Sequence, residues 1–425
     1  MRLLYTIVFY CLLPFILLRL IWRSFAAPAY ARRWAERFGF FPKLITSKKV
    51  VWLHTVSVGE FLAALPMIRR LMADERLQLV ITTTTPTGSE RVRATLGDSV
   101  FHVYAPYDVP DALARFFKRV KPSVYLVMET ELWPNTLAAC ARRKVPAILV
   151  NGRLSERSAR GYARFSGLTS PMLNNLQLAL IQNHTDAKRF VQLGLHESKL
   201  RVTGNIKFDL SLTDELRLRA AELKKQFIAS GDKIIWIAAS THQGEDEIIL
   251  DVFSEIRKKT NKSAQQLILI LVPRHPERFE KVGQLCDARG FKTIRRSHGG
   301  SVADMDILLG DTMGELMLLF GVSDIAFVGG SLVPNGGHNF IEPAAWGLPL
   351  LSGEHLFNFA EVSNLLMAAN ALDVAHNPDE LEKILGNLLD NSEVRKQKGE
   401  NALRVAIENR GALDKTLNLI KSILQ

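Results

Sequence analysis

Hydrophobic residues in the first half of the chain gather in short runs that alternate with amphipathic stretches. Five of these runs are apolar throughout and rich in β-branched residues, which is typical of strands buried on both faces of a sheet. They are VVWLHTV, LQLVITTT, SVYLVMET, PAILVNG and LQLALIQN. Stretches with helical spacing lie between them, such as GSERVRATL and VPDALARFFKRV. The alternation predicts parallel strands joined by crossover helices.

A second series of the same kind follows residue 204, and a charged helical stretch, TDELRLRAAELKKQF, opens it. Its strand-like runs are KIIWIAAST, QLILILVPRHP, FKTIRR, DILLGD, DIAFVGG and LPLLSG. A chain of 425 residues is also too long for one ordinary core. We therefore expect an α/β protein with two Rossmann-like domains, over residues 49–210 and 211–425. Such folds bind ligands at the carboxyl ends of their strands.

The N-terminus carries one long apolar segment. Residues 3–18 are uncharged, and the apolar stretch resumes after Arg19, giving about 20 residues, enough to span a bilayer as a helix. A tryptophan and an arginine follow in place of a small-residue cleavage site, which disfavours a signal peptide. Because most nearby arginines lie after the segment, the positive-inside rule places the body in the cytoplasm. We expect residues 1–22 to be a membrane anchor helix. Pro14 and Arg19 leave open a helix that lies partly in the interface.

Charge is spread unevenly along the chain. The net charge is +11, but residues 1–200 hold 28 Lys and Arg against 13 Asp and Glu, and residues 201–425 hold 26 against 30. The basic residues form no known nucleic-acid reader motif, so we expect a membrane surface or an anionic substrate and no nucleic acid.

Residues 23–48 mix arginines with aromatic residues, which predicts a juxtamembrane segment. In it, Arg32, Arg33 and Arg37 would meet lipid headgroups. The alternative is a solvated connector whose aromatic residues cap the core.

Acidic and basic residues stand where the strands of the first half end. Glu60 follows VVWLHTV, and Glu129 and Glu131 stand at the end of SVYLVMET. Glu60 could act as a general base, although a carboxylate in the first helical turn is also favourable by about 0.3–1 kcal/mol. Glu129 and Glu131 should share one face of a strand, where one needs a cationic partner or a role. Lys207 could neutralise a leaving phosphate or be a linker residue.

In the second half of the chain, several strand-like runs are followed by residues that could bind an anion. Arg274 follows LILILVP and suits a phosphate. GDTMGEL predicts a helix with Thr312 as N-cap and Glu315 at the capping-box position, which leaves N–H groups free for a phosphate. After the Gly-rich GGSLVPNGGHN, Asn339 could cap a helix and Glu342 could accept from two ribose hydroxyls. The ten histidines make no pair at ligand spacing, so no metal is implied.

Eight motifs follow one another along the chain: HTVSVGE, TTTTPTGSERV, METELWPN, GNIKFD, LVPRHPERF, GDTMGELMLL, FVGGSL and GGHNFIEPAA. In this order they resemble one family, the 3-deoxy-D-manno-octulosonic acid (Kdo) transferases of lipopolysaccharide assembly. The resemblance implies a GT-B fold with two lobes facing a central cleft, the first binding the acceptor and the second the CMP-sugar. It also implies an inverting glycosyltransferase that moves Kdo from CMP-Kdo to the lipid A precursor (lipid IVA) at the cytoplasmic face of the inner membrane.

The resemblance also assigns roles to residues. It makes Glu60 the proton acceptor and gives Glu129 and Lys207 transition-state stabilisation. The implied CMP contacts are Pro273, Arg274, Met313, Gly314, Glu315, Asn339, Phe340, Ile341 and Glu342. A CMP-sugar has a single phosphodiester, so cations and helix N-termini could suffice without a metal cofactor. The alternatives are another GT-B nucleotide-sugar enzyme, such as an epimerase or an N-acetylglucosaminyltransferase, and a catalytically inactive membrane-tethered binding protein.

Overall fold

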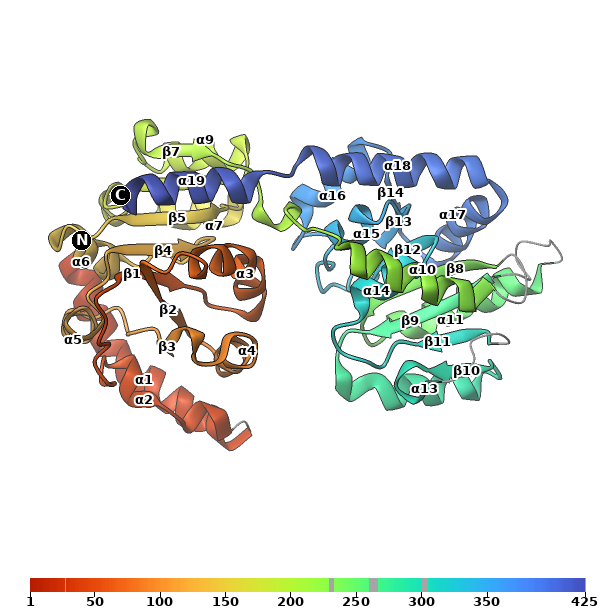
Figure 1. Cartoon of the computed structure of the whole chain (residues 1–425), viewed down its shortest axis with the longest axis horizontal. Coiled ribbons are helices and arrows are strands. Elements are labelled where there is room, and N and C mark those ends of the chain that lie inside the picture. Colours follow the sequence, from red (N-terminus) through yellow and green to blue (C-terminus); the bar gives the residue numbers. More distant parts are fainter. Residues whose placement is uncertain (27, 229–232, 260–266, 300–304, 425) are drawn as a thin grey trace. The chain divides into compact units, whose positions relative to one another are not determined.

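The computed structural model divides into two compact units (Figure 1). The first combines Met1–Asp209 with Arg410–Gln425, and the second is Leu210–Asn409. The residues that the structure describes are 1–26, 28–228, 233–259, 267–299 and 305–424. Gln266, the first residue of one predicted strand, lies outside them. The chain divides near residue 210, as expected, but the expected second domain, 211–425, wrongly includes residues 410–425, which belong to the first unit.

The last residues belong to the first unit because helix α19 (Ala412–Leu424) packs on it. Leu417 and Ile420 of this helix are buried in one of the first unit's apolar cores. Asp209 holds the start of the helix, since its carboxylate accepts from the N–H groups of Gly411 and Leu413. A sequence pattern shows that α19 is amphipathic, but not which unit covers its apolar face.

The first unit is built on a seven-stranded parallel sheet in the order β3-β2-β1-β4-β5-β6-β7. Its strands are β1 (Lys49–His54), β2 (Leu77–Thr83), β3 (Phe101–Tyr104), β4 (Val124–Met128), β5 (Ala147–Gly152), β6 (Leu178–Ile181) and β7 (Leu200–Val202). The five predicted strands are confirmed. The short β3 and β7 were not among them, because neither forms a long apolar run.

Helices flank this sheet, and most strands are followed by one. They are α1 (Arg2–Ala26), α2 (Trp34–Arg37), α3 (Val58–Met72), α4 (Pro86–Leu96), α5 (Pro110–Val120), α6 (Pro134–Arg142), α7 (Glu156–Ala163), α8 (Ser166–Asn174) and α9 (His184–Gln192). Successive residues of a strand face opposite sides of the sheet. Trp52 belongs to one buried cluster and its neighbours Val51 and Leu53 to another. Both faces are therefore covered, as the apolar strands predicted.

The second unit repeats this plan with a parallel sheet in the order β10-β11-β9-β8-β12-β13-β14. Its strands are β8 (Ile234–Thr241), β9 (Leu267–Pro273), β10 (Thr293–Arg295), β11 (Ile307–Leu309), β12 (Ile325–Val328), β13 (Leu350–Gly353) and β14 (Leu372–Ala375). Its helices are α10 (Asp214–Ile228), α11 (Glu245–Lys258), α13 (Phe279–Ala288), α14 (Leu316–Val322), α15 (Ile341–Ala345), α16 (Ala360–Ala368), α17 (Pro378–Asp390) and α18 (Ser392–Glu408). Only β14 was not predicted.

Helix α1 is long and apolar enough to cross a membrane, and its apolar residues are largely exposed. The segment that follows it differs from the prediction. Arg37 is buried, with its Nη2 donating to the Thr84 carbonyl (2.9 Å) and its guanidinium over the Tyr104 ring. Arg33 donates to Ser89 Oγ (2.8 Å). These two arginines therefore bind the body of the unit, while Arg32 is exposed and its contact with lipid headgroups stays a prediction.

Candidate active site

Glu60 lies in the first turn of α3, directly after β1. Ser57 is the N-cap residue of this helix, and its Oγ accepts from the Glu60 N–H. The Glu60 carboxylate in turn accepts from the Val56 N–H (2.8 Å) and from Ser57 Oγ (3.2 Å). Burial raises the pKa of this carboxyl to about 7, helped by the negative charges of Glu129 and Glu131. Glu60 thus caps its helix and is also poised to exchange a proton near neutral pH.

Glu129 stands just past the end of β4 with a left-handed backbone, at φ 55°. Its side chain is 8% exposed. The structure corrects the expected strand placement: β4 ends at Met128, so Glu129 and Glu131 are not alternate residues of one strand. A non-glycine residue at positive φ is strained, and such strain concentrates at functional sites.

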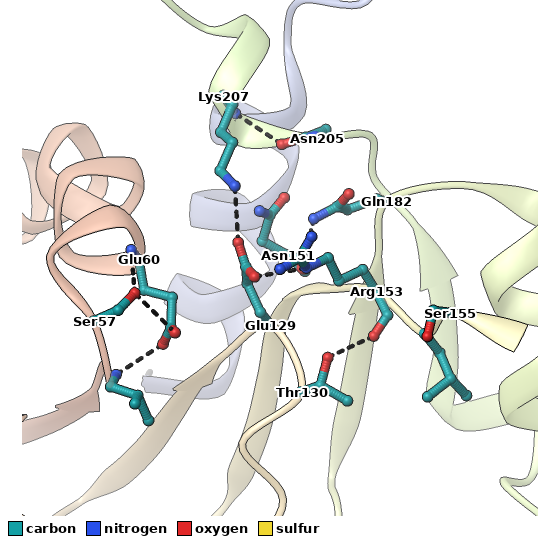
Figure 2. Close-up of polar contacts among 12 residues, drawn as sticks. Ser57, Glu60, Glu129, Thr130, Asn151, Arg153, Ser155, Gln182, Asn205 and Lys207 are labelled. Atoms are coloured by element: carbon teal, nitrogen blue, oxygen red, sulfur yellow. Dashed lines mark hydrogen bonds and ion pairs between the residues drawn. The ribbon is translucent and has the colours of Figure 1, made fainter. Parts of the chain in front are cut away.

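Two cations hold the Glu129 carboxylate (Figure 2). Lys207 Nζ lies 2.9 Å from Oε1, and Arg153 Nε lies 2.7 Å from Oε2. Lys207 reaches it from the short η4 turn (Ile206–Phe208), whose start Asn205 fixes by accepting from the Lys207 N–H. Because the carboxylate is buried and paired on both oxygens, the predicted need for a cationic partner is met.

Asn151, at the end of β5, ties the η4 turn to the sheet. Its backbone is also left-handed (φ 54°), and its Oδ1 accepts from the Ile206 N–H (3.0 Å). The side chain is buried. Glu60, Glu129 and Lys207 are therefore brought together at the carboxyl edge of the first sheet by the ends of β1, β4 and β5.

In the second unit, Pro273 ends β9 and the exposed Arg274 follows it. The Arg274 N–H donates to the Thr241 carbonyl at the end of β8. Burial raises the pKa of Glu342, while a hydrogen bond with Asn339 and the charge of Arg274 lower it. The charge of Arg274, which follows β9, thus reaches Glu342 in helix α15.

The predicted helix start at residues 312–315 is wrong in its details. Helix α14 begins at Leu316, with Glu315 at its N-cap position. Glu315 is held by Arg296, which donates through Nε (3.1 Å) and Nη2 (2.9 Å), and these bonds lower the pKa of its carboxyl. Thr312 Oγ1 also donates to it. Met313 is 68% exposed, and Gly314 has φ 88°. The loop thus presents exposed backbone and one exposed thioether.

The helix after the Gly-rich loop, α15, also begins differently. Phe340 occupies its N-cap position, and Asn339 Oδ1 accepts from the Ile341 N–H (3.0 Å), so Asn339 still satisfies a free donor of the first turn. Phe340 and Ile341 are buried, so their side chains face the core. Any ligand contact made by these two residues would use the backbone.

The described residues contain no group of three or more His, Cys, Asp or Glu side chains arranged to hold a metal ion.

Comparison with known proteins shows the family of the chain. The family model of the 3-deoxy-D-manno-octulosonic-acid transferases matches residues 32–210. A 3-deoxy-D-manno-octulosonic acid transferase from Haemophilus influenzae is 43% identical over the whole chain and 99% of its own length. One from Bordetella pertussis is 36% identical over 76% of this chain and 75% of its own. The chain belongs to the Kdo transferase family.

The family is one of glycosyltransferases that act in lipopolysaccharide core assembly, so the predicted family and enzyme class are confirmed. A crystal structure of UDP-GlcNAc 2-epimerase from Neisseria meningitidis covers 88% of this chain and 99% of its own at a TM-score of 0.58 and 14% identity. At that identity the likeness shows the fold alone. It agrees with the predicted GT-B architecture of two parallel-sheet α/β lobes.

The motifs missed two residues that shape the candidate site of this Kdo transferase family member. Arg153 directly follows strand β5 and pairs with Glu129. Its position as a cation directly after a strand end could have identified it from the sequence. Glu245 is fully buried in the first turn of α11 and accepts from the N–H groups of Gly330, Ser331 and Leu332. These three donors lie 85 to 87 residues away, so no local sequence pattern indicates them, although the His242 N–H, three residues away, also donates to this carboxylate.

Proposed function

We propose that the protein transfers Kdo from CMP-Kdo to the anionic lipid A precursor, lipid IVA, with inversion at the anomeric carbon. The observation that carries the mechanism is the Glu60 carboxyl, whose pKa of about 7 suits a general base at neutral pH. An ordinary exposed glutamate would be a much weaker base. Burial at the end of β1 supplies this property, and the neighbouring carboxylates add to it.

The proposed reaction is a single displacement. The acceptor hydroxyl oxygen attacks the anomeric carbon of Kdo while the bond from that carbon to the phosphate oxygen breaks. CMP leaves with the electron pair, and the hydroxyl proton passes to Glu60. The neighbouring Gly59 leaves room for this approach, because a Cβ there would meet only Ser57 Oγ, at 3.8 Å. A positioned base contributes roughly 10²–10⁴-fold.

Glu129, Lys207 and Arg153 stabilise the charge that develops in this reaction. One carboxylate and two cations leave the trio with a net charge of +1, and Glu129 fixes both cations by its two oxygens. Preorganised positive charge at a partly buried site stabilises a forming anion without reorganising at the moment of reaction. Lys207 is the group we assign to the developing charge, and Glu129 orients it.

The donor binds to the second unit in this proposal. Arg274 contacts the phosphate, and Glu342 accepts from the ribose hydroxyls. The remaining donor contacts are Pro273, Met313, Gly314, Glu315, Asn339, Phe340 and Ile341. Most of these act through the backbone, since Phe340 and Ile341 are buried and Glu315 is held by Arg296. A single phosphodiester carries little charge, so these groups suffice without a metal.

The acceptor binds to the first unit, at the cytoplasmic face of the inner membrane, in this proposal. Helix α1 attaches the protein there through its exposed apolar residues. The excess of basic residues in the first 200 favours an anionic leaflet and an acceptor that carries phosphates.

The test uses the full-length protein in detergent with a bisphosphorylated, acylated glucosamine disaccharide as acceptor. CMP-Kdo and UDP-sugars are offered in parallel, and mass spectrometry and NMR identify the product and its anomeric configuration. We expect Kdo addition from CMP-Kdo alone, with inversion. Transfer or epimerisation of a UDP-sugar would favour another GT-B enzyme, and donor binding without turnover would favour an inactive binding protein.

A further inference from the structure

An apolar groove of about 650 Å³ lies on the first unit, against the N-terminal helix. Three segments form its walls: the start of α1, the loop and helix start at 132–134, and helices α7 and α8. Its lining includes Leu4, Val8, Trp133, Tyr162, Phe165 and Leu168. The volume lies within the usual range of small-molecule sites, and aliphatic and aromatic side chains dominate the lining.

The start of α1 is held to the body of the unit by specific contacts, so it is a fixed wall of this groove. Asn135 Nδ2 donates to Thr6 Oγ1 (2.9 Å), and the Tyr10 hydroxyl donates to Asp111 Oδ1 (2.6 Å). The Phe9 ring lies 6.5 Å from that of Tyr107. A helix that served only as a tether would need none of these bonds.

The groove lies beside the candidate active site, because residues 132 and 133 line it and Glu129 precedes them by three residues. Tyr162, on its wall, donates to the Thr130 carbonyl (3.5 Å), next to Glu129. Trp133, on another wall, lies close enough to Glu131 to lower the pKa of that carboxyl against the effect of burial, and the charge of Glu131 in turn raises the pKa of Glu60. A ligand lying in the groove would therefore have its polar end beside the residues that we assign to the transfer.

Basic side chains stand beside the groove on α7. Arg157 lies four residues before Gly161, a lining residue, and so shares its helix face. Arg160 precedes the same glycine, Arg164 is the C-cap residue of α7 three residues after it, and all three arginines are exposed. An apolar groove with a cationic edge complements a molecule that has apolar chains and anionic groups at one end.

We propose that this groove binds acyl chains of the lipid acceptor, so that the first turns of α1 are part of the acceptor site and not only an anchor. The arginines of α7 contact the acceptor's phosphates. This assignment rests on the proposed function for the identity of the lipid, but the groove and its occupant can be tested without turnover.

The deciding experiment is photolabelling of the full-length protein in detergent micelles. The probe is a bisphosphorylated lipid A precursor that carries a diazirine near the end of one acyl chain, used without donor. We expect the label on residues 1–8 and on α8. Label found elsewhere on the chain would overturn the proposal. Absence of Kdo transfer with labelling in the groove would instead refute the proposed function alone.

Ordinary bilayer lipid is the other possible occupant, and a second probe separates the two. A phospholipid with the same diazirine chain should label the groove weakly, and an excess of unlabelled acceptor should remove that label. Equal labelling by the phospholipid that the acceptor does not displace would mean that the groove contacts bulk membrane, against the proposal.

Matched variants give an independent measurement. A Cβ at Gly161 meets nothing within 4 Å, so Gly161→Trp should fold and fill the groove. Ala163→Trp, exposed on the same helix and not in the lining, is its control. We expect Gly161→Trp alone to raise the KM for acylated acceptor about 10-fold or more. The KM for donor and for deacylated acceptor should stay unchanged.

A second pair of variants tests the helix itself. Leu4→Asn places an amide in the groove, and Leu3→Asn changes the neighbouring residue, which is more exposed and outside the lining. Only Leu4→Asn should raise the KM for acylated acceptor. Equal effects of the two variants, or an effect of Gly161→Trp that persists with deacylated acceptor, would show that α1 does not line the acyl-chain site.

Discussion

Glu60 and Glu129, assigned to the transfer, are held differently from Arg274, Met313 and Glu315, assigned to the donor. In the first unit, Glu129 is buried and Glu60 half-buried, and each carboxylate has two defined partners within 3.2 Å. In the second unit, Arg274 and Met313 are exposed. Glu315 has its carboxylate engaged by Arg296.

This difference agrees with the two functions that we propose, catalysis at the carboxyl edge of the first sheet (the first edge) and nucleotide binding at that of the second sheet (the second edge). A group that must accept a proton or steady a transition state needs a fixed position and a tuned pKa, which burial and paired charges provide. A nucleotide can be held by exposed cations and backbone groups, whose exact side chains matter less. We therefore expect substitutions at the first edge to lower the rate of transfer and those at the second to weaken donor binding.

The largest effect should come from Glu60. Glu60→Gln keeps an oxygen that can accept from the Val56 N–H, so the helix start survives, but the base is lost. Transfer should fall about 10²–10⁴-fold while the Kd for CMP, measured by calorimetry, stays the same. Near-normal transfer by this variant would leave Glu60 with its capping role alone.

The pH dependence sharpens the same test. Only the deprotonated carboxylate accepts a proton, so the wild-type rate should rise with pH through about 7 and then level off. Glu131→Gln removes a negative charge that helps to raise the Glu60 pKa, so the rise should move to lower pH. A rise unmoved by this substitution would point to another titrating group.

A smaller effect on kcat should distinguish Lys207 from Arg153, the two cations that contact the Glu129 carboxylate. Lys207 is 26% exposed and Arg153 49% exposed, and each removal leaves the carboxylate one partner. Lys207→Met should lower kcat about 10²–10³-fold, as expected for losing a preorganised charge. Arg153→Met should cost about 10-fold or less, because solvent screens its guanidinium. Equal losses in kcat would mean that both cations only hold Glu129 in place.

Much of this arrangement could be predicted from the sequence because it depends on short-range patterns. Apolar runs of β-branched residues identified eleven strands, and the strand ends placed Glu60, Glu129 and Arg274 at the edges of their sheets. The strands that were missed, β3, β7 and β14, each have a polar residue among their three or four: His102, Arg201 and Asp373. Strands of the same length were identified where they belong to a longer apolar run, as β6 does, because the run and not the strand length is the signal.

What could not be predicted depends on contacts between distant parts of the chain. The left-handed backbone of Glu129 and the burial of Arg37 follow from packing, not from their neighbours in sequence. Helix α1 shows the same limit: its composition predicts an anchor, but its bond to Asn135 joins residues 129 apart. Helix α19 likewise shows an apolar face without showing its partner.

The smallest effects should come from the second edge, where Arg274 and Glu315 can be compared directly. Arg274→Ala should raise the Kd for CMP about 10–100-fold, since a hydrogen bond to a charged group contributes about 1.5–3 kcal/mol. Glu315→Gln should change it by less than about 5-fold, because that carboxylate is held by Arg296 and a half-exposed ion pair contributes about 0–1 kcal/mol. Lys281→Ala, at an exposed position of α13, is the control. In all three variants, kcat and the pH at which the transfer rate rises should stay unchanged. A larger loss of CMP affinity in Glu315→Gln than in Arg274→Ala would show that the second edge also binds through a fixed carboxylate, and the contrast between the two edges would then fail.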